Sequence, residues 1–154
     1  MPNSIALLIA SKKWWGGKFV ALTGSSLTIS NMPKKILIIE DEEIMFSLLE
    51  KRLKGEGYDI QIARDGQAGL AMMRQEKPDL VLLDIIMPKM NGFDVLEAMR
   101  ADSSLKDVSA IIISNSGQSV ELDRAKELGV KDWLIKTEFD IQEVLAKVKK
   151  QLNL

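Results

Sequence analysis

The chain has 154 residues, 46% of them hydrophobic, and a formal net charge of −1, which suits one domain of ordinary size with a buried core. It contains neither cysteine nor histidine, so disulfides, thiolate chemistry, histidine-dependent catalysis and histidine metal sites are excluded. The near-neutral charge provides no positive field for nucleic acid, and we expect no direct binding to it.

The first 31 residues differ in character from the rest of the chain. They contain no acidic residue, and lysines surround Trp14 and Trp15. The apolar run Ile5–Ala10 is far shorter than the roughly 20 residues that span a bilayer, so we predict no membrane span. We predict that residues 1–31 form an N-terminal extension, disordered or tag-like. The alternative is a segment that binds a membrane surface or a partner protein.

Residues 32–154 are predicted to form the folded domain, because short apolar runs alternate there with amphipathic stretches. Turn and stop signals, such as Gly57, Gly129 and the pair Asp65-Gly66, separate these segments. In chain order we predict strand Lys35–Glu40, helix Glu42–Glu56, strand Tyr58–Ala63, a helix from Gly66 to about Glu76, strand Leu80–Asp84, helix Gly92–Ala101, strand Ala110–Ser114, helix Ser119–Leu128, strand Asp132–Ile135 and helix Asp140–Leu152.

Five repeats of strand and helix predict an α/β fold with a parallel sheet and helices on both faces. Unbroken apolar runs, as at residues 80–83 and 111–113, are typical of strands buried on both sides. We therefore predict a flavodoxin-like, doubly wound sheet of five parallel strands in the order 2-1-3-4-5, with five helices. Ligands of such sheets bind beyond the carboxyl ends of the strands, where the strand order reverses.

Five polar residues follow those strand ends: Glu40, Asp41, Asp84, Ser114 and Lys136. Each alone is more often a turn, cap or solvated residue. Together, four separate strands deliver them to the same edge of the sheet. Like charges about 4 Å apart repel by about 4 kcal/mol at an effective dielectric near 20, so the carboxylates need a counter-charge. Lys136 supplies one, and oxygen ligands suit Mg²⁺.

Four segments resemble one known family, the receiver domains of bacterial two-component response regulators. The run KILIIEDEE at 35–43 resembles their first strand and acidic pair, and LLDIIMPKMNG at 82–92 resembles their phospho-acceptor loop. The run IIIS at 111–114 resembles the strand with the switch hydroxyl, and DWLIK at 132–136 the strand with the lysine. The resemblance covers residues 34–152.

The resemblance implies a role for each matching residue. Asp84 would be the nucleophile that accepts a phosphoryl group. Asp41 would bind Mg²⁺ directly, Glu40 would bind it through water, and the backbone carbonyl of Ile86 would complete the protein ligands.

The resemblance also implies the switch residues. The Ser114 hydroxyl and the Lys136 ammonium would each bind a phosphoryl oxygen, and Trp133 would occupy the aromatic switch position. The chain would thus be a phosphorylation-dependent switch in a two-component system or phosphorelay. It would catalyse no reaction other than its own phosphorylation and dephosphorylation.

Its implied partners are a sensor histidine kinase or phosphotransfer protein and a downstream protein target, and its implied location is the cytoplasm. We expect a single receiver domain without an attached output domain. A phosphorylation-dependent homodimer is a further output that the resemblance allows.

The sequence departs from the family pattern at four positions, one of which is Trp133, bulkier than the usual tyrosine or phenylalanine. Thr137 stands where proline usually follows the lysine, and because a non-proline cis bond costs about 2.5–4 kcal/mol, we predict a trans bond there. Ile86 and Asn115 are expected to restrict water and slow dephosphorylation. Two alternatives remain: a pseudo-receiver that binds a partner without phosphorylation, and a phosphatase with an aspartate nucleophile, whose motif requires a second aspartate at the position of Ile86.

Overall fold

The computed structural model describes residues 12–15, 18–23, 26–30, 32–115, 117–138 and 140–154, and within 12–30 only the backbone. The chain divides into two compact units, Met1–Pro33 and Lys34–Leu154. None of the helices in the described ranges is long and apolar enough to cross a lipid bilayer.

The described strands of the first unit form a small antiparallel sheet in the order β1-β2-β3. They are β1 (Lys12–Trp15), β2 (Lys18–Thr23) and β3 (Ser26–Ser30). No strand was predicted in this segment, and its assignment as a disordered or tag-like extension stays a prediction. Strands this short are held by pairing with their neighbours, which the periodicity of a single sequence does not register. The role of the segment and the boundary at residue 32 stay predictions.

The second unit contains every strand and helix that we predicted after Met32, with ends shifted by no more than one residue. Its strands are β4 (Lys35–Ile39), β5 (Asp59–Ala63), β6 (Leu80–Asp84), β7 (Ser109–Ser114) and β8 (Asp132–Ile135). Its α-helices are α1 (Glu43–Gly55), α2 (Gly66–Gln75), α3 (Gly92–Ala101), α4 (Ser119–Glu127) and α5 (Ile141–Gln151).

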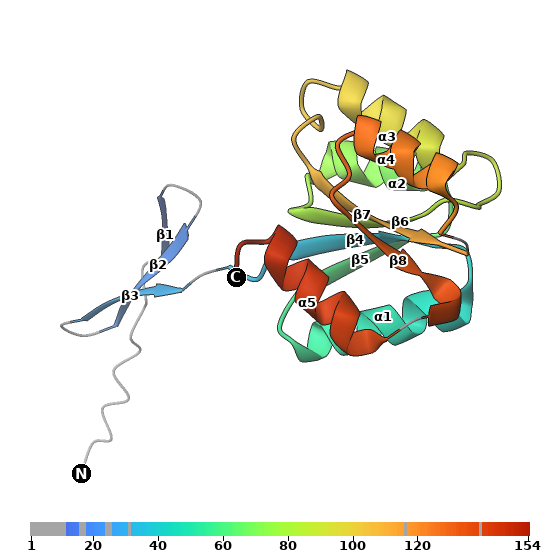
Figure 1. Ribbon diagram of the computed structural model, residues 1–154. Helices are drawn as coiled ribbons and strands as arrows, with labels where there is room; N and C mark the ends of the chain where they lie inside the picture. The colour runs from blue at the N-terminus through green and yellow to red at the C-terminus, as the bar shows by residue number, and fades with distance from the viewer. Residues whose placement is uncertain (1–11, 16–17, 24–25, 31, 116, 139) are drawn as a thin grey trace, which may run out of the picture. The chain divides into compact units, whose positions relative to one another are not determined.

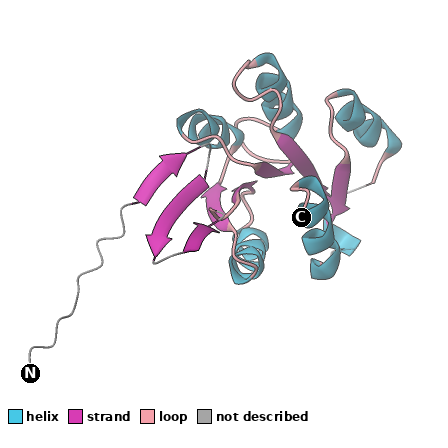
Figure 2. Ribbon diagram, turned by 90° about the vertical axis from the view of Figure 1, so that its left-hand side faces the viewer, coloured by secondary structure: helices cyan, strands magenta, loops and turns pink. Residues whose placement is uncertain are grey.

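The five strands pair in parallel in the order β5-β4-β6-β7-β8. The predicted order 2-1-3-4-5 is therefore confirmed. Helices α1 and α5 cover one face of this sheet, and α2, α3 and α4 cover the other (Figure 1). Figure 2 shows the same layers from the side, with the magenta strands between cyan helices. The strand order reverses between β4 and β6, so their carboxyl ends border the predicted site.

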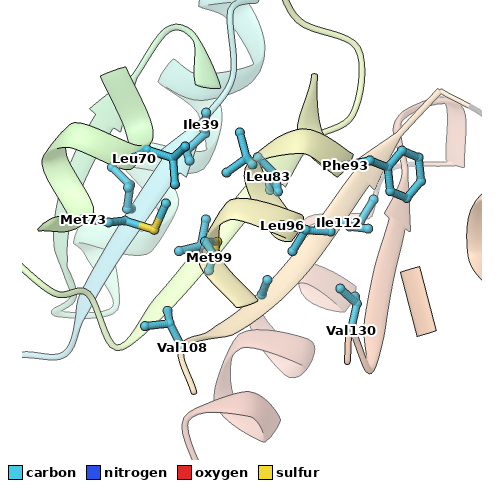
Figure 3. Close-up of a cluster of buried hydrophobic side chains, with 14 of the residues drawn as sticks. Ile39, Leu70, Met73, Leu83, Phe93, Leu96, Met99, Val108, Ile112 and Val130 are labelled. Carbon is cyan, nitrogen blue, oxygen red and sulfur yellow. The ribbon is translucent and has the colours of Figure 1, made fainter. Parts of the chain in front are cut away.

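Alternate residues of each strand enter two separate cores, one on each face of the sheet. On β6, Val81 and Leu83 pack toward α2, α3 and α4, whereas Leu80 and Leu82 pack toward α1 and α5. Figure 3 shows the first of these cores, where Leu83 lies among Ile39, Leu96 and other side chains. Because β6 is buried on both faces, its last residue reaches the edge of the sheet on a rigid strand.

Helices α1, α2, α4 and α5 begin or end at capping or glycine residues that the sequence predicts as boundaries. Asp65 and Asp140 cap α2 and α5 by accepting hydrogen bonds from backbone N–H groups at 2.8 Å and 2.9 Å. Gly57 and Gly129 follow α1 and α4 with φ of 89° and 78°, a left-handed conformation that favours glycine. These caps fix where each helix meets the adjacent strand.

Candidate functional site

Three carboxylates meet at the carboxyl ends of β4 and β6, as predicted. Glu40 and Asp41 follow β4, and Asp84 is the last residue of β6. One oxygen from each of the three lies within 4.8 Å of the others. Glu40 and Asp84 are buried, with 0% and 1% of their surface exposed, whereas Asp41 is exposed.

Lys136 reaches the same cluster from the end of β8. Its Nζ donates hydrogen bonds to Asp84 Oδ2 at 3.1 Å, Glu40 Oε1 at 3.1 Å and Glu42 Oε1 at 2.7 Å. Only 6% of the Lys136 side chain is exposed. This buried ammonium is held firmly, because its removal would leave buried carboxylates uncompensated.

Burial dominates the electrostatics of the carboxylates. It raises the pKa of Glu40 from 4.5 to about 7, with a further rise from the charge of Asp84, although the bonds from Lys136 and from the Glu42 N–H oppose it. Burial likewise raises the pKa of Asp84, against the charge of Lys136. Burial alone would lower the pKa of Lys136, but its bonds to Glu42 and Glu40 and the charge of Asp84 outweigh burial and raise it.

The cluster fits a hard divalent cation. Its potential ligands are carboxylate oxygens, which suit Mg²⁺, and one ammonium does not balance the carboxylates around it. The buried Oε2 of Glu40 accepts no hydrogen bond from any described group, although it lies 3.0 Å from Lys136 Nζ. A carboxylate oxygen has two lone pairs, so this oxygen can bind a cation or its bound water while it stays in contact with Lys136. Glu40, Asp41 and Asp84 are the residues placed to hold the cation.

Hydrogen bonds to Asp84 and Ile85 anchor the two ends of the loop after β6. The Ile86 N–H donates to Asp84 Oδ1 at 3.2 Å, and the Gly92 N–H donates to the Ile85 carbonyl at 2.9 Å. A Cβ at Gly92 would lie 2.9 Å from Cα of Ile85 and closer still to the carbonyl oxygen of Asp84. Glycine is therefore required for α3 to begin beside the carboxylate.

The hydroxyl of Ser114, the predicted switch residue, lies at the end of β7. Its hydrogen-bond partner, Glu121, was not predicted. Ser114 is buried and its Oγ donates to Glu121 Oε2, in the first turn of α4, at 3.1 Å. This contact links the strand end to α4.

Trp133, the predicted aromatic switch residue, is half-buried on β8 and packs against the core beneath α2, α3 and α4. Lys126 Nζ lies 5.5 Å from the centre of its ring, and Lys147 Nζ donates to its carbonyl at 2.5 Å. Trp133 therefore contacts both α4 and α5.

Lys136 opens a short 3-10 turn, Lys136–Glu138. No peptide bond in the described part of the chain is cis, which confirms the trans bond predicted before Thr137. The departure from the family pattern therefore leaves Lys136 in contact with Asp84.

Sequence reasoning missed two residues of the site. Glu42 had a signal, because it is the third member of the acidic run 40–43. Glu121 had no such signal. A glutamate in the first turn of a helix is common because it interacts favourably with the helix dipole, so the sequence does not single this residue out.

Comparisons with known proteins agree with this geometry. A family model described as the response regulator receiver domain matches residues 36–149. The DNA-binding dual master transcriptional regulator RpaA of Synechocystis is 37% identical over 122 residues, which are 79% of this chain and 50% of RpaA. The chain thus spans about half the length of the curated relatives it matches.

Solved structures share the fold of residues 34–154. The chemotaxis response regulator CheY4 of Vibrio cholerae has a TM-score of 0.73 and 25% identity, over 78% of this chain and 99% of CheY4. The receiver domain of a sensor histidine kinase from Pseudomonas aeruginosa PAO1 has a TM-score of 0.72 and 20% identity, over 79% of this chain and 99% of that one. That structure has a magnesium ion coordinated in its active site cleft.

Proposed function

Because the chain belongs to the response regulator receiver domain family, we propose that Asp84 accepts a phosphoryl group from a sensor histidine kinase or a phosphotransfer protein. The chain is a two-component receiver domain, and the proposal assigns its chemistry to particular residues. The observation that supports it best is the buried Asp84 carboxylate, 3.1 Å from the Lys136 ammonium, at the point where the strand order reverses.

In the proposed step, an Asp84 carboxylate oxygen attacks phosphorus in line with the donor's leaving group. A new O–P bond forms as the bond from phosphorus to the leaving group breaks. Lys136 donates to an oxygen of the arriving phosphoryl group. Glu40, Asp41, Asp84 and the carbonyl of Ile86 would hold Mg²⁺, which when bound would offset the negative charge that gathers on the phosphoryl oxygens.

Output is proposed to follow from the switch residues. The Ser114 hydroxyl exchanges its bond with Glu121 for one with a phosphoryl oxygen, so the loop between β7 and α4 moves. Trp133 contacts α4 and α5, and these elements form the two-state surface that a downstream protein target reads. We propose that the chain catalyses only its own phosphorylation and dephosphorylation, and that it makes no direct contact with nucleic acid. Its location in the cytoplasm stays a prediction.

Phosphorylation of the purified chain tests the proposal. With Mg²⁺ and acetyl phosphate, intact-mass spectrometry should find one added phosphoryl group, and chelation of the metal should prevent it. Asp84→Asn should remain unmodified. Asp79→Asn is the matched control, because Asp79 stands just before the opposite end of the same strand, where it contacts Lys34 and Lys35. This variant should be phosphorylated as the wild type is.

Three results distinguish the alternatives. If Asp84→Asn gains the group as the wild type does, Asp84 is not the acceptor. Steady release of phosphate from a phosphate ester would indicate a phosphatase. Partner binding that a phosphodonor leaves unchanged would indicate a pseudo-receiver.

A further inference from the structure

Lys136 is surrounded by more carboxylates than its proposed role requires. An ammonium has three protons to donate, and Glu40, Asp84 and Glu42 each accept one. Glu40 and Asp84 belong to the proposed acidic site, but Glu42 does not. A phosphoryl oxygen on Asp84 can therefore bind Lys136 only if one of these carboxylates releases it.

Glu42 is the carboxylate that can leave. The Glu42 side chain is 57% exposed, whereas the side chains of Glu40 and Asp84 are 0% and 1% exposed. A buried carboxylate without its cation is costly, but an exposed one is solvated by water. Glu42 Oε1 nevertheless makes the shortest of the three contacts, at 2.7 Å from Nζ.

The Glu42 side chain has no evident task in holding the fold together. Glu42 is the N-cap residue of α1, yet its side chain makes no capping hydrogen bond. Its backbone N–H donates to Glu40 Oε1 at 3.1 Å, and a change of side chain leaves that bond in place. Substitution of the carboxylate should therefore preserve α1 and the position of Glu40.

We propose that Glu42 is a positioning residue that occupies Lys136 in the unphosphorylated protein and competes with the phosphoryl group for it. This inference rests on the proposed function of Asp84. Glu42 acts in two ways, since it takes a proton of Lys136 and its negative charge repels the incoming phosphoryl dianion. Glu42 thereby lowers the rate of phosphorylation and the affinity for phosphoryl mimics.

The test compares Glu42→Gln with Glu43→Gln. Both substitutions remove one negative charge at the start of α1, but Glu43 accepts no described hydrogen bond from Lys136. Phosphorylation by acetyl phosphate is followed by intact mass. In this reaction an oxygen of Asp84 bonds to phosphorus, the bond from phosphorus to acetate breaks, and acetate leaves as an anion. Beryllofluoride affinity, measured by isothermal titration, is the second measurement and involves no turnover.

We expect Glu42→Gln to raise both the phosphorylation rate constant and the beryllofluoride affinity about two- to fivefold, the range of an exposed ion pair. Glu43→Gln should match the wild type. Equal effects of the two variants would show that bulk charge alone acts, and a slower or weaker Glu42→Gln would show that Glu42 holds Lys136 productively. Either result overturns the inference while the wild type is still phosphorylated on Asp84. A wild type that gains no phosphoryl group would instead refute the proposed function.

Discussion

The buried carboxylate of Glu40 should destabilise the metal-free protein at neutral pH, and Glu40→Gln should relieve this. Glutamine has nearly the same size and keeps a carbonyl oxygen that can accept from the Glu42 N–H and from Lys136. The substitution therefore removes one negative charge from a site in which Asp84 is also buried, and changes little else.

The magnitude follows from the pKa of Glu40, which burial raises from 4.5 to about 7. At about 1.4 kcal/mol per pH unit, this rise corresponds to at most about 3.5 kcal/mol of stability lost by the ionised form. The folded protein binds the proton more tightly than the unfolded chain does, so wild-type stability falls as pH rises from about 4.5 through 7. Because glutamine also gives up an ionic bond to Lys136, we expect Glu40→Gln to gain about 1–3 kcal/mol at pH 8.

Urea unfolding with a metal chelator measures this difference at pH 5 and pH 8. At pH 5 Glu40 is largely protonated, so the two proteins should have similar free energies of unfolding. At 100 times its dissociation constant, Mg²⁺ should stabilise the wild type by about 2.7 kcal/mol, and it should stabilise Glu40→Gln less. Glu43→Gln, an exposed change in the first turn of α1, should respond to pH and to Mg²⁺ as the wild type does.

The reasoning fails if Glu40→Gln is no more stable than the wild type at pH 8 with chelator. It also fails if the variant gains the same stability at pH 5 as at pH 8. Either outcome would mean that ionisation of Glu40 does not destabilise the folded protein.

Three further predictions concern other parts of the site. Gly92→Ala should lose about 1–3 kcal/mol of stability in urea unfolding, because its Cβ would overlap the backbone of Asp84; Gly55→Ala, with nothing within 4 Å of the new Cβ, should lose none. Lys136→Met should lose about 3–5 kcal/mol with chelator, since it leaves buried carboxylates unpaired, and Mg²⁺ should restore a large part. Glu121→Gln should weaken the acceptor that holds the Ser114 hydroxyl by about 0.5–1 kcal/mol and so tighten beryllofluoride binding about two- to fivefold; weaker binding would contradict it.

The sequence predicted the architecture of residues 34–154 well, for physical reasons. Strands β6 and β7 are unbroken apolar runs, and only burial on both faces makes such a run favourable. Aspartates and glycines mark the helix ends because these residue types act locally. The side chain of Asp65 caps the first turn of α2, and Gly129 adopts the left-handed conformation that ends α4. The strands of the first unit were not predicted, because strands this short depend on pairing with neighbours, which a single sequence does not show.

The sequence also predicted which residues would meet at the site, but not how they would pair. The carboxyl ends of parallel strands lie at the same edge of the sheet, so Glu40, Asp84 and Lys136 were expected to lie close together. The contacts of Lys136 with Glu42 and of Ser114 with Glu121 depend on where loops and first helical turns lie. No periodicity in the sequence encodes those positions.

The backbone bond between Gly92 and Ile85 turns the segment 86–91 into a loop with anchored ends. Changes within the loop can therefore leave the strand that bears Asp84 in place. Ile86 is 62% exposed and the Lys89 side chain is also 62% exposed, so both side chains face solvent. A rate-tuning substitution of the Ile86 side chain belongs there, because the Ile86 group that contacts Asp84 is a backbone N–H, which such a substitution leaves in place.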